Sequence, residues 1–337
     1  MSVRFIVACV TLSVAVFCVA VSGNAQDSAA TWELPRTADG HPDLQGVWAN
    51  NSATPLERPD VWAGKTSLTR EELAGFQAAA ADVTASGADA QFGDQLAFAA
   101  LAGLTDADSY DPATGNYNQF WMVERDFDNR TSLITVPSDG RLPMLTTEAQ
   151  AHGWGQPPSP ITEKADSWTD RPLNERCITY GVPSLFAGYN AYYQIFQSRD
   201  HAVVFMEMIH DARVIPINGQ AHLGAGVRQL HGDPRGYWDG DTLVIETTNY
   251  SKTGAFWNAS IGLRVTERFS RVGPEALHYE ITIDDPATWT QPWTVMIPLK
   301  RSEDPLFEYA CHEGNLGMEG ILAGYRAQER DAAARSR

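Results

Sequence analysis

The residue types best suited to proton transfer gather in one stretch of the chain, between residues 207 and 222. Glu207, His210 and Asp211 stand close together, and Arg213 and His222 follow them. Imidazole and carboxylate groups are the usual general acids and bases of enzymes, and imidazole is also a common metal ligand. The stretch therefore predicts acid–base chemistry or a metal site. A purely structural hydrogen bond between His210 and Asp211 is the alternative.

A second stretch with the same kind of chemistry lies near the C-terminus, where His312 and Glu313 follow Cys311. If the fold brings the two stretches together, His210 acts as base or acid and His312 with Glu313 supplies the opposite proton. Glu207 or Asp211 would orient His210 in that scheme. Loop architecture is the other interpretation of His312.

Basic side chains near these stretches suggest how a substrate could be held. Arg213 and Arg228 could bind a substrate carboxylate or stabilise a developing oxyanion. His222 is a further candidate for substrate contact. The same imidazoles also define a metal alternative made of His210, His222 and His312, although their spacings match no compact metal motif.

Glu267 occupies an unusual phase in a predicted strand. Alternate residues of a strand face opposite sides of the sheet, so Glu267 shares a face with Leu263, Val265 and Phe269. An ionised carboxylate on an apolar face is costly unless it is paired or hydrogen-bonded. Glu267 is therefore predicted to have a role that requires a buried carboxylate, and we count it among the candidate catalytic residues.

Four aromatic residues are candidates for stacking against a ligand, with the core as the alternative location for each of them. They are Trp121, Tyr192, Trp257 and Trp293.

Most of the chain after Tyr117 has the pattern of short strands. Segments 132–136, 192–197, 202–217, 264–272, 277–283 and 290–299 are rich in β-branched and aromatic residues and end at turn-forming residues. Asp239-Gly240-Asp241 is a hairpin turn between 237–238 and 242–248. This pattern predicts a mainly β, antiparallel, lipocalin-like barrel or sandwich.

Helices are predicted only at the two ends of the mature chain. Thr69 with Glu72 forms a capping box before a helix, and an alanine-rich helix covers residues 90–104. A polar helix covers 317–334. We expect an N-terminal extension with two helices at 26–116 and a β-rich core at 117–337, together one structural unit.

The first 25 residues have the features of a secretory signal peptide. Arg4 precedes an apolar run over residues 5–21, and Gly23 and Ala25 occupy the positions that a signal peptidase reads. Cleavage there predicts a periplasmic or secreted protein without stable membrane insertion. An uncleaved membrane anchor is the alternative, because the run approaches the ~17 residues that span a bilayer.

The net charge limits the possible binding partners, and the cysteine content indicates the redox environment in which the protein folds. The chain has 42 Asp and Glu against 25 Lys and Arg, a net charge of −17, which repels nucleic acid. After cleavage only Cys177 and Cys311 remain, and two thiols in an exported protein favour a disulfide over a metal pair or a nucleophile. No nucleotide-binding or CxxC motif is present, and no cofactor is predicted.

Several short motifs resemble those of a large family of exported bacterial proteins of unknown function. The similar segments are Tyr117–Trp121, Arg130–Ile134, Asp139–Pro143, Glu175–Ile178, Met208–Arg213, Trp238–Val244 and Tyr309–Asn315. The resemblance covers nearly the whole mature chain and implies export, a β-rich fold and one structural unit. It assigns no catalytic role, and the alanine-rich segment 77–104 departs from it.

Three functions are consistent with these observations. The first is a lyase or hydrolase that uses general acid–base catalysis on a carbohydrate or plant-derived small molecule. The second is a lipocalin-like binding protein without chemistry, and the third is a protein with a histidine-based metal site.

Overall fold

The computed structural model describes residues 32–86, 89–104, 117, 121–157, 165–311 and 313–335. The chain from Leu34 to Arg337 forms one compact unit that includes both the N-terminal helices and the sheet. The predicted signal peptide, residues 1–25, lies outside the described residues. Within the described ranges, no helix is long and apolar enough to cross a membrane.

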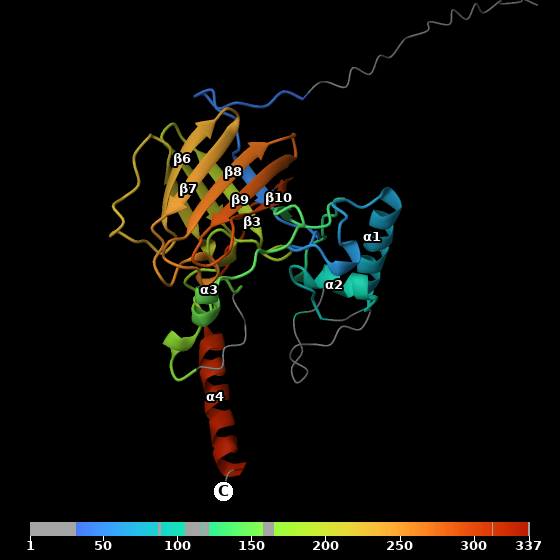
Figure 1. Ribbon diagram of the computed structural model, residues 1–337, viewed down its shortest axis with the longest axis vertical. Coiled ribbons are helices and arrows are strands. Elements are labelled where there is room, and N and C mark those ends of the chain that lie inside the picture. Colours follow the sequence, from blue (N-terminus) through green and yellow to red (C-terminus); the bar gives the residue numbers. More distant parts are fainter. Residues whose placement is uncertain are drawn as a thin grey trace, which may run out of the picture. The chain divides into compact units, whose positions relative to one another are not determined.

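Ten antiparallel strands form one sheet in the order β5-β4-β3-β1-β10-β9-β8-β7-β6, with β2 paired to β10 (Figure 1). The strands are β1 (Gly46–Ala49), β2 (Ile134–Val136), β3 (Tyr192–Gln197), β4 (His201–Met206), β5 (Ala212–Pro216), β6 (Asp233–Asp239), β7 (Thr242–Thr248), β8 (Arg264–Arg271), β9 (Ala276–Asp284) and β10 (Trp293–Ser302). The short β1 therefore joins the β3–β5 group to the β6–β10 group.

The two edges of the sheet approach each other without forming a ladder. A Cβ atom on Gly236 of β6 would lie 2.5 Å from Ile217 Cγ2 and 3.1 Å from Ile215 Cγ2 of the β5 region. A glycine at this position allows the close packing of the two edges. The sheet is nevertheless not closed into a barrel, because β5 and β6 share no hydrogen-bonded pairing. The antiparallel sheet predicted from the sequence is confirmed, and closure into a barrel is not.

The buried face of this sheet holds the main core. Alternate residues of β8, β9 and β10 are buried, as the strand period requires. Fully buried aromatic side chains fill the centre of the core, and they include Trp48, Phe269, Tyr279, Trp289 and Trp293. Burial of each such side chain contributes about 1.5–3 kcal/mol.

The N-terminal helices form a second, smaller core. Helix α1 (Arg70–Ala85) begins at the predicted capping box, since Thr69 and Glu72 bond reciprocally at its first turn. Helix α2 (Gln95–Ala102) is shorter than the predicted 90–104 helix. Phe76 of α1 and Leu96 of α2 belong to the cluster buried between them, and the two helices lie side by side in Figure 1.

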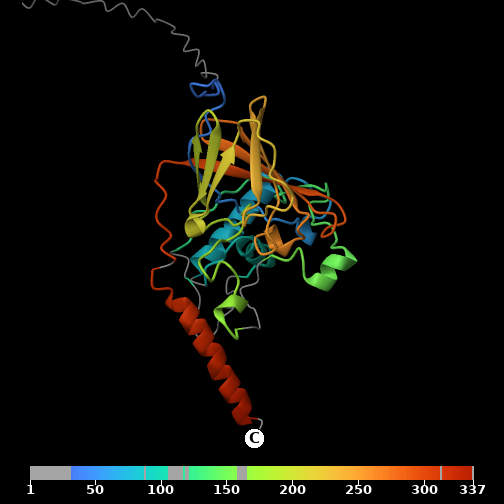
Figure 2. The ribbon, with the colours of Figure 1, turned by 90° about the vertical axis from the view of Figure 1, so that its left-hand side faces the viewer.

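Two further helices complete the described structure. The short α3 (Thr147–His152) was not predicted, and its N-cap Thr146 accepts a hydrogen bond from Ala149 N–H. Helix α4 (Leu316–Arg335) confirms the predicted C-terminal helix and has no buried residue. In Figure 2, α4 is the red helix that follows the connection from β10.

Candidate functional site

The turn that joins β4 to β5 carries the predicted proton-transfer residues and holds a strained backbone. Glu207, Asp211 and the residues between them form this turn, which Met206 N–H closes by donating to Asp211 O at 2.8 Å. Ile209 and His210 have φ of 54° and 46°. The left-handed region is unfavourable for a β-branched residue and costs about 1–3 kcal/mol per residue. Such strain marks the turn as a candidate site.

Asp211 is buried and is the centre of a small polar network. Thr179 Oγ1 donates to Asp211 Oδ2 at 2.6 Å, and His231 Nε2 lies 3.4 Å from Asp211 Oδ1. His231 Nε2 also contacts Thr179 Oγ1 at 3.0 Å. Because Thr179 gives its proton to Asp211, its oxygen accepts the proton of His231. This arrangement fixes one nitrogen of the imidazole and its tautomer.

The other ring nitrogen of His231, Nδ1, takes no part in this network. No described residue bonds to Nδ1, and the His231 side chain is 21% exposed. Burial lowers the pKa of His231, and the nearby Arg213 cation adds to this effect against the attraction of Asp211. Burial raises the pKa of Asp211, and its hydrogen bond from Thr179 opposes the shift. A neutral imidazole oriented by a carboxylate has the arrangement of a general base.

Glu207 is a second buried carboxylate at the start of the same turn. Hydrogen bonds from Phe307 N–H and the Asn190 side chain reach it, but burial raises its pKa above 4.5. Its Oε2 atom is buried and accepts no hydrogen bond from the described part of the chain. No cation pairs with Glu207 in that part, so the acid is drawn toward its protonated form.

Tyrosine side chains lie around these acids. Burial raises the pKa of Tyr189 to about 12, with further contributions from Tyr117, Tyr309 and Glu207. Burial also raises the pKa of Tyr180, to which Tyr309 contributes. These phenols stay protonated near neutral pH and can donate hydrogen bonds to an anionic or hydroxyl-bearing ligand.

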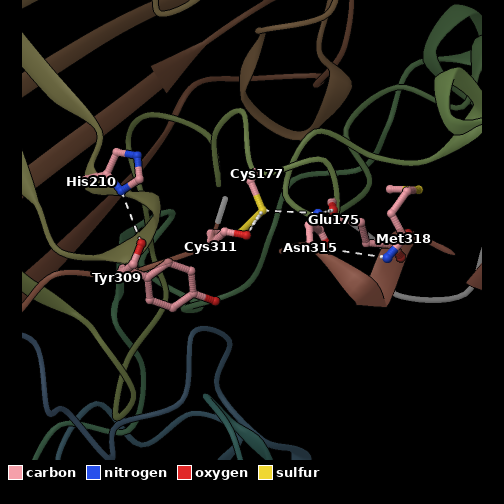
Figure 3. The surroundings of a disulfide bond; sticks show 7 residues. All are labelled: Glu175, Cys177, His210, Tyr309, Cys311, Asn315 and Met318. Atoms are coloured by element: carbon pink, nitrogen blue, oxygen red, sulfur yellow. Dashed lines mark hydrogen bonds between the residues drawn. A yellow bond between two sulfur atoms is a disulfide. The ribbon is translucent and has the colours of Figure 1, made fainter. Parts of the chain in front are cut away.

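A disulfide fastens the segment that passes over the turn (Figure 3). Cys177 and Cys311 are bonded, as predicted, across a sequence separation of 134 residues. Just before Cys311, Tyr309 O lies 3.2 Å from His210 Nδ1. After Cys311, Asn315 donates to Glu175 O at 3.1 Å and accepts from Met318 N–H. The disulfide thus holds residues 307–311 against Glu207 and His210.

Glu267 and Arg213 lie deeper, inside the sheet. Arg213 donates two hydrogen bonds to the Glu267 carboxylate, at 2.5 Å from Nη1 and 2.7 Å from Nη2, and Tyr279 OH donates a third. Both charged side chains are at most 3% exposed. The pKa of Arg213 is raised by Glu267 despite the opposing effect of burial. This pairing gives Glu267 and Arg213 structural partners and separates them from solvent.

The other predicted basic residues hold loops. His222 Nδ1 lies 3.2 Å from Asp233 Oδ2, and Asp233 is also paired with Arg235 at 2.6 Å. Arg228 donates to Tyr250 O at 3.1 Å and to Ile261 O at 2.8 Å. The structure therefore does not bring His222 or Arg228 into the polar network of Asp211.

The four aromatic candidates have different surroundings. Trp293 is fully buried, and Trp257 packs against it with ring centroids 5.5 Å apart, so both belong to the core. Trp121 is 56% exposed. Tyr192 is half-buried at the start of β3, where its carbonyl accepts a hydrogen bond from Glu207 N–H. Tyr192 therefore contacts the candidate site directly, through its hydrogen bond with Glu207.

The described residues provide no geometry for the metal hypothesis or for the two-histidine scheme. His312 lies outside the described residues, and Glu313 is exposed. Among the residues with a described position, no three His, Cys, Asp or Glu side chains are grouped so that they could hold a metal ion.

Sequence reasoning missed His231, Thr179 and the surrounding tyrosines. His231 follows a loop without periodicity, so no phase indicates where its side chain lies. Thr179 belongs to the turn-rich stretch after Cys177, and only the tertiary fold brings it to Asp211. The one available signal for Thr179 was its position two residues after Cys177, which forms the predicted disulfide.

Comparison of the whole chain with protein-family models, with curated proteins and with solved structures gave no match.

Proposed function

We propose that the protein is an enzyme that uses general acid–base catalysis at the β4–β5 turn. The observation that supports this best is the Asp211–His231 pair, in which the carboxylate and Thr179 hold Nε2 while Nδ1 has no described partner. An oriented imidazole with a lowered pKa is neutral near pH 7 and can accept a proton.

Glu207 supplies the complementary group in this proposal. Its raised pKa favours the protonated carboxyl, which can return a proton to a leaving group. One group that removes a proton and one that returns it are what lyase and hydrolase reactions require. His210, exposed at the same turn, is a further proton carrier at the rim.

The substrate class that we propose is a neutral, hydroxyl-bearing small molecule, with carbohydrates and plant-derived compounds as the first to test. Protonated phenols of Tyr180 and Tyr189 offer donors to such a ligand. The excess of acidic residues over basic ones disfavours polyanionic substrates.

The test compares the protein with variants over a panel of glycosides and plant phenolic esters or ethers, with products followed by NMR. We expect turnover of at least one member, and a fall of about 10²–10⁴-fold in His231→Gln and Asp211→Asn. Glu280→Gln, at an exposed position of β9, is the matched control and should keep full activity. Equal turnover in all variants would place the chemistry elsewhere.

A further inference from the structure

A polar cavity lies on the sheet near the point where β1 is held between β3 and β10. Its volume is about 210 Å³, and its lining includes Asn51, Glu124, Asp126, Tyr192 and Lys300. Arg301 and Ser302, the last residues of β10, complete the polar part of the lining. The cavity is large enough to hold several waters or one sugar-sized ring.

The lining residues themselves carry equal numbers of acidic and basic groups. Glu124 and Asp126 contribute two carboxylates, and Lys300 and Arg301 contribute two cations. Asp126 forms an ion pair with Lys300, and Arg301 Nε lies 3.5 Å from Glu303. An anion would lie against the Glu124 carboxylate and a cation against Lys300 and Arg301, so the lining favours a ligand without net charge.

The lining offers both donors and acceptors of hydrogen bonds. Lys300 and Arg301 can only donate, whereas carboxylates can only accept when ionised. Glu124 has no hydrogen-bond or ion-pair partner among the described residues, and Asn51 Oδ1 is buried without one. Hydroxyl groups are the ligand atoms that satisfy both kinds of partner, since each donates one bond and accepts others.

An aromatic side chain completes the site. Tyr192 is half-buried in the lining, and burial raises the pKa of its phenol, which a hydrogen bond from Asn51 opposes. An aromatic ring beside donors and acceptors offers a ligand an apolar surface together with polar partners.

We infer that this cavity binds one ring of a neutral saccharide or a polyol of similar size. The inference goes beyond the proposed catalysis, because binding at this cavity requires no reaction at Glu207 or His231. A charged ligand of the same size would lie against a side chain of like charge there, and an apolar ring would make no hydrogen bond to Glu124 or Lys300.

The experiment is calorimetric titration of the protein with the methyl pyranosides of glucose, galactose, mannose and xylose. Cyclohexanol serves as the apolar ring, and glucuronate and glucosamine serve as the charged counterparts. We expect at least one methyl pyranoside to bind better than all three controls. The inference would be overturned if none of the four pyranosides gave binding heat at millimolar concentrations, or if a charged counterpart bound more tightly.

Variants locate the binding. Asn51→Ala is expected to weaken it by about tenfold, which corresponds to ~1.4 kcal/mol, and Glu124→Gln by a smaller factor. Glu124 is exposed, so this second variant tests the site even if Asn51→Ala fails to fold. Glu246→Gln on β7 is the matched control. Unchanged affinity in both cavity variants would place the ligand elsewhere.

Discussion

Two buried carboxylates, Glu267 and Glu207, stand in opposite electrostatic situations. Glu267 receives two hydrogen bonds from Arg213 and one from Tyr279 inside the sheet. Glu207 has no cationic partner among the described residues, one of its oxygens is unsatisfied, and burial raises its pKa. Compensation of the charge makes Glu267 part of the architecture. Without such compensation, Glu207 is drawn toward its protonated form.

The same contrast extends to the residues around each acid. The neighbours of Glu267 lie on regular strands, whereas Glu207 begins a turn that forces Ile209 and His210 into the left-handed region. Strained backbone persists only where surrounding contacts impose it, and it clusters at functional sites. The disulfide and the segment 307–311 supply such contacts at this turn.

The largest expected effect comes from removing one member of the interior pair. Arg213→Met leaves Glu267 charged and buried, so the free energy of unfolding in urea should fall by about 3–5 kcal/mol. The double variant Arg213→Met/Glu267→Leu should recover most of that loss, because no charge remains buried. An equal loss in the single and double variants would mean that packing, not charge, dominates there.

Removal of the disulfide is expected to have the next largest effect. Cys177→Ala opens a loop that spans 134 residues, and the free energy of unfolding should fall by about 2–4 kcal/mol. The contacts of Tyr309 with His210 depend on the same tether, so amide exchange in 307–311 should increase more than in β8. Uniform exchange changes across the chain would contradict a local role for the tether.

Asp94, near α2, tests how a partly compensated acid behaves. Burial raises its pKa from 3.8 to about 6, although Leu56 N–H and Arg125 oppose the shift. As the pH rises from 3.8 to 6, the unfolded chain loses this proton first, so the free energy of unfolding falls by up to about 3 kcal/mol. Asp94→Asn should remove this dependence from pH-resolved urea unfolding. An unchanged slope in the variant would exclude Asp94 as its source.

The proposed acid and base predict the shape of the activity profile. His231 must be neutral, so the rate rises through a pKa that lies below 6.5, and Glu207 must be protonated, so the rate falls through a pKa above 4.5. A bell-shaped profile follows, with the basic limb set by Glu207 and the acidic limb by His231. Glu207→Gln should remove the alkaline limb of any residual activity, and a rate that keeps rising to pH 9 would contradict these roles.

The regular part of the fold could be predicted from local patterns. The period of two located β8, β9 and β10 and placed Glu267 on the apolar face. The capping box at Thr69 located the start of α1, and the two cysteines outside the predicted signal peptide indicated the bond between Cys177 and Cys311. Each of these features depends on residues near in sequence or on very few possible pairs.

The site could be predicted only in part, because its members come from distant loops. His210 and Asp211 were identified from their residue types, but Asp211 is oriented by Thr179 and faces His231, which no local pattern indicated. Trp293 and Trp257 looked equally suited to stacking and to the core, and only the packing of the folded chain places them in the core. Closure of a barrel depends on how the strands twist, which a strand pattern does not encode.

One matched measurement tests the central contrast most directly: the free energies of unfolding of Glu267→Gln and Glu207→Gln at pH 7. The first variant leaves Arg213 without a counter-charge and should lose about 3–5 kcal/mol. The second replaces an uncompensated acid by a neutral amide of the same shape and should keep or gain up to about 1 kcal/mol. Equal losses in the two variants would contradict the account, because Glu207 would then be as structural as Glu267.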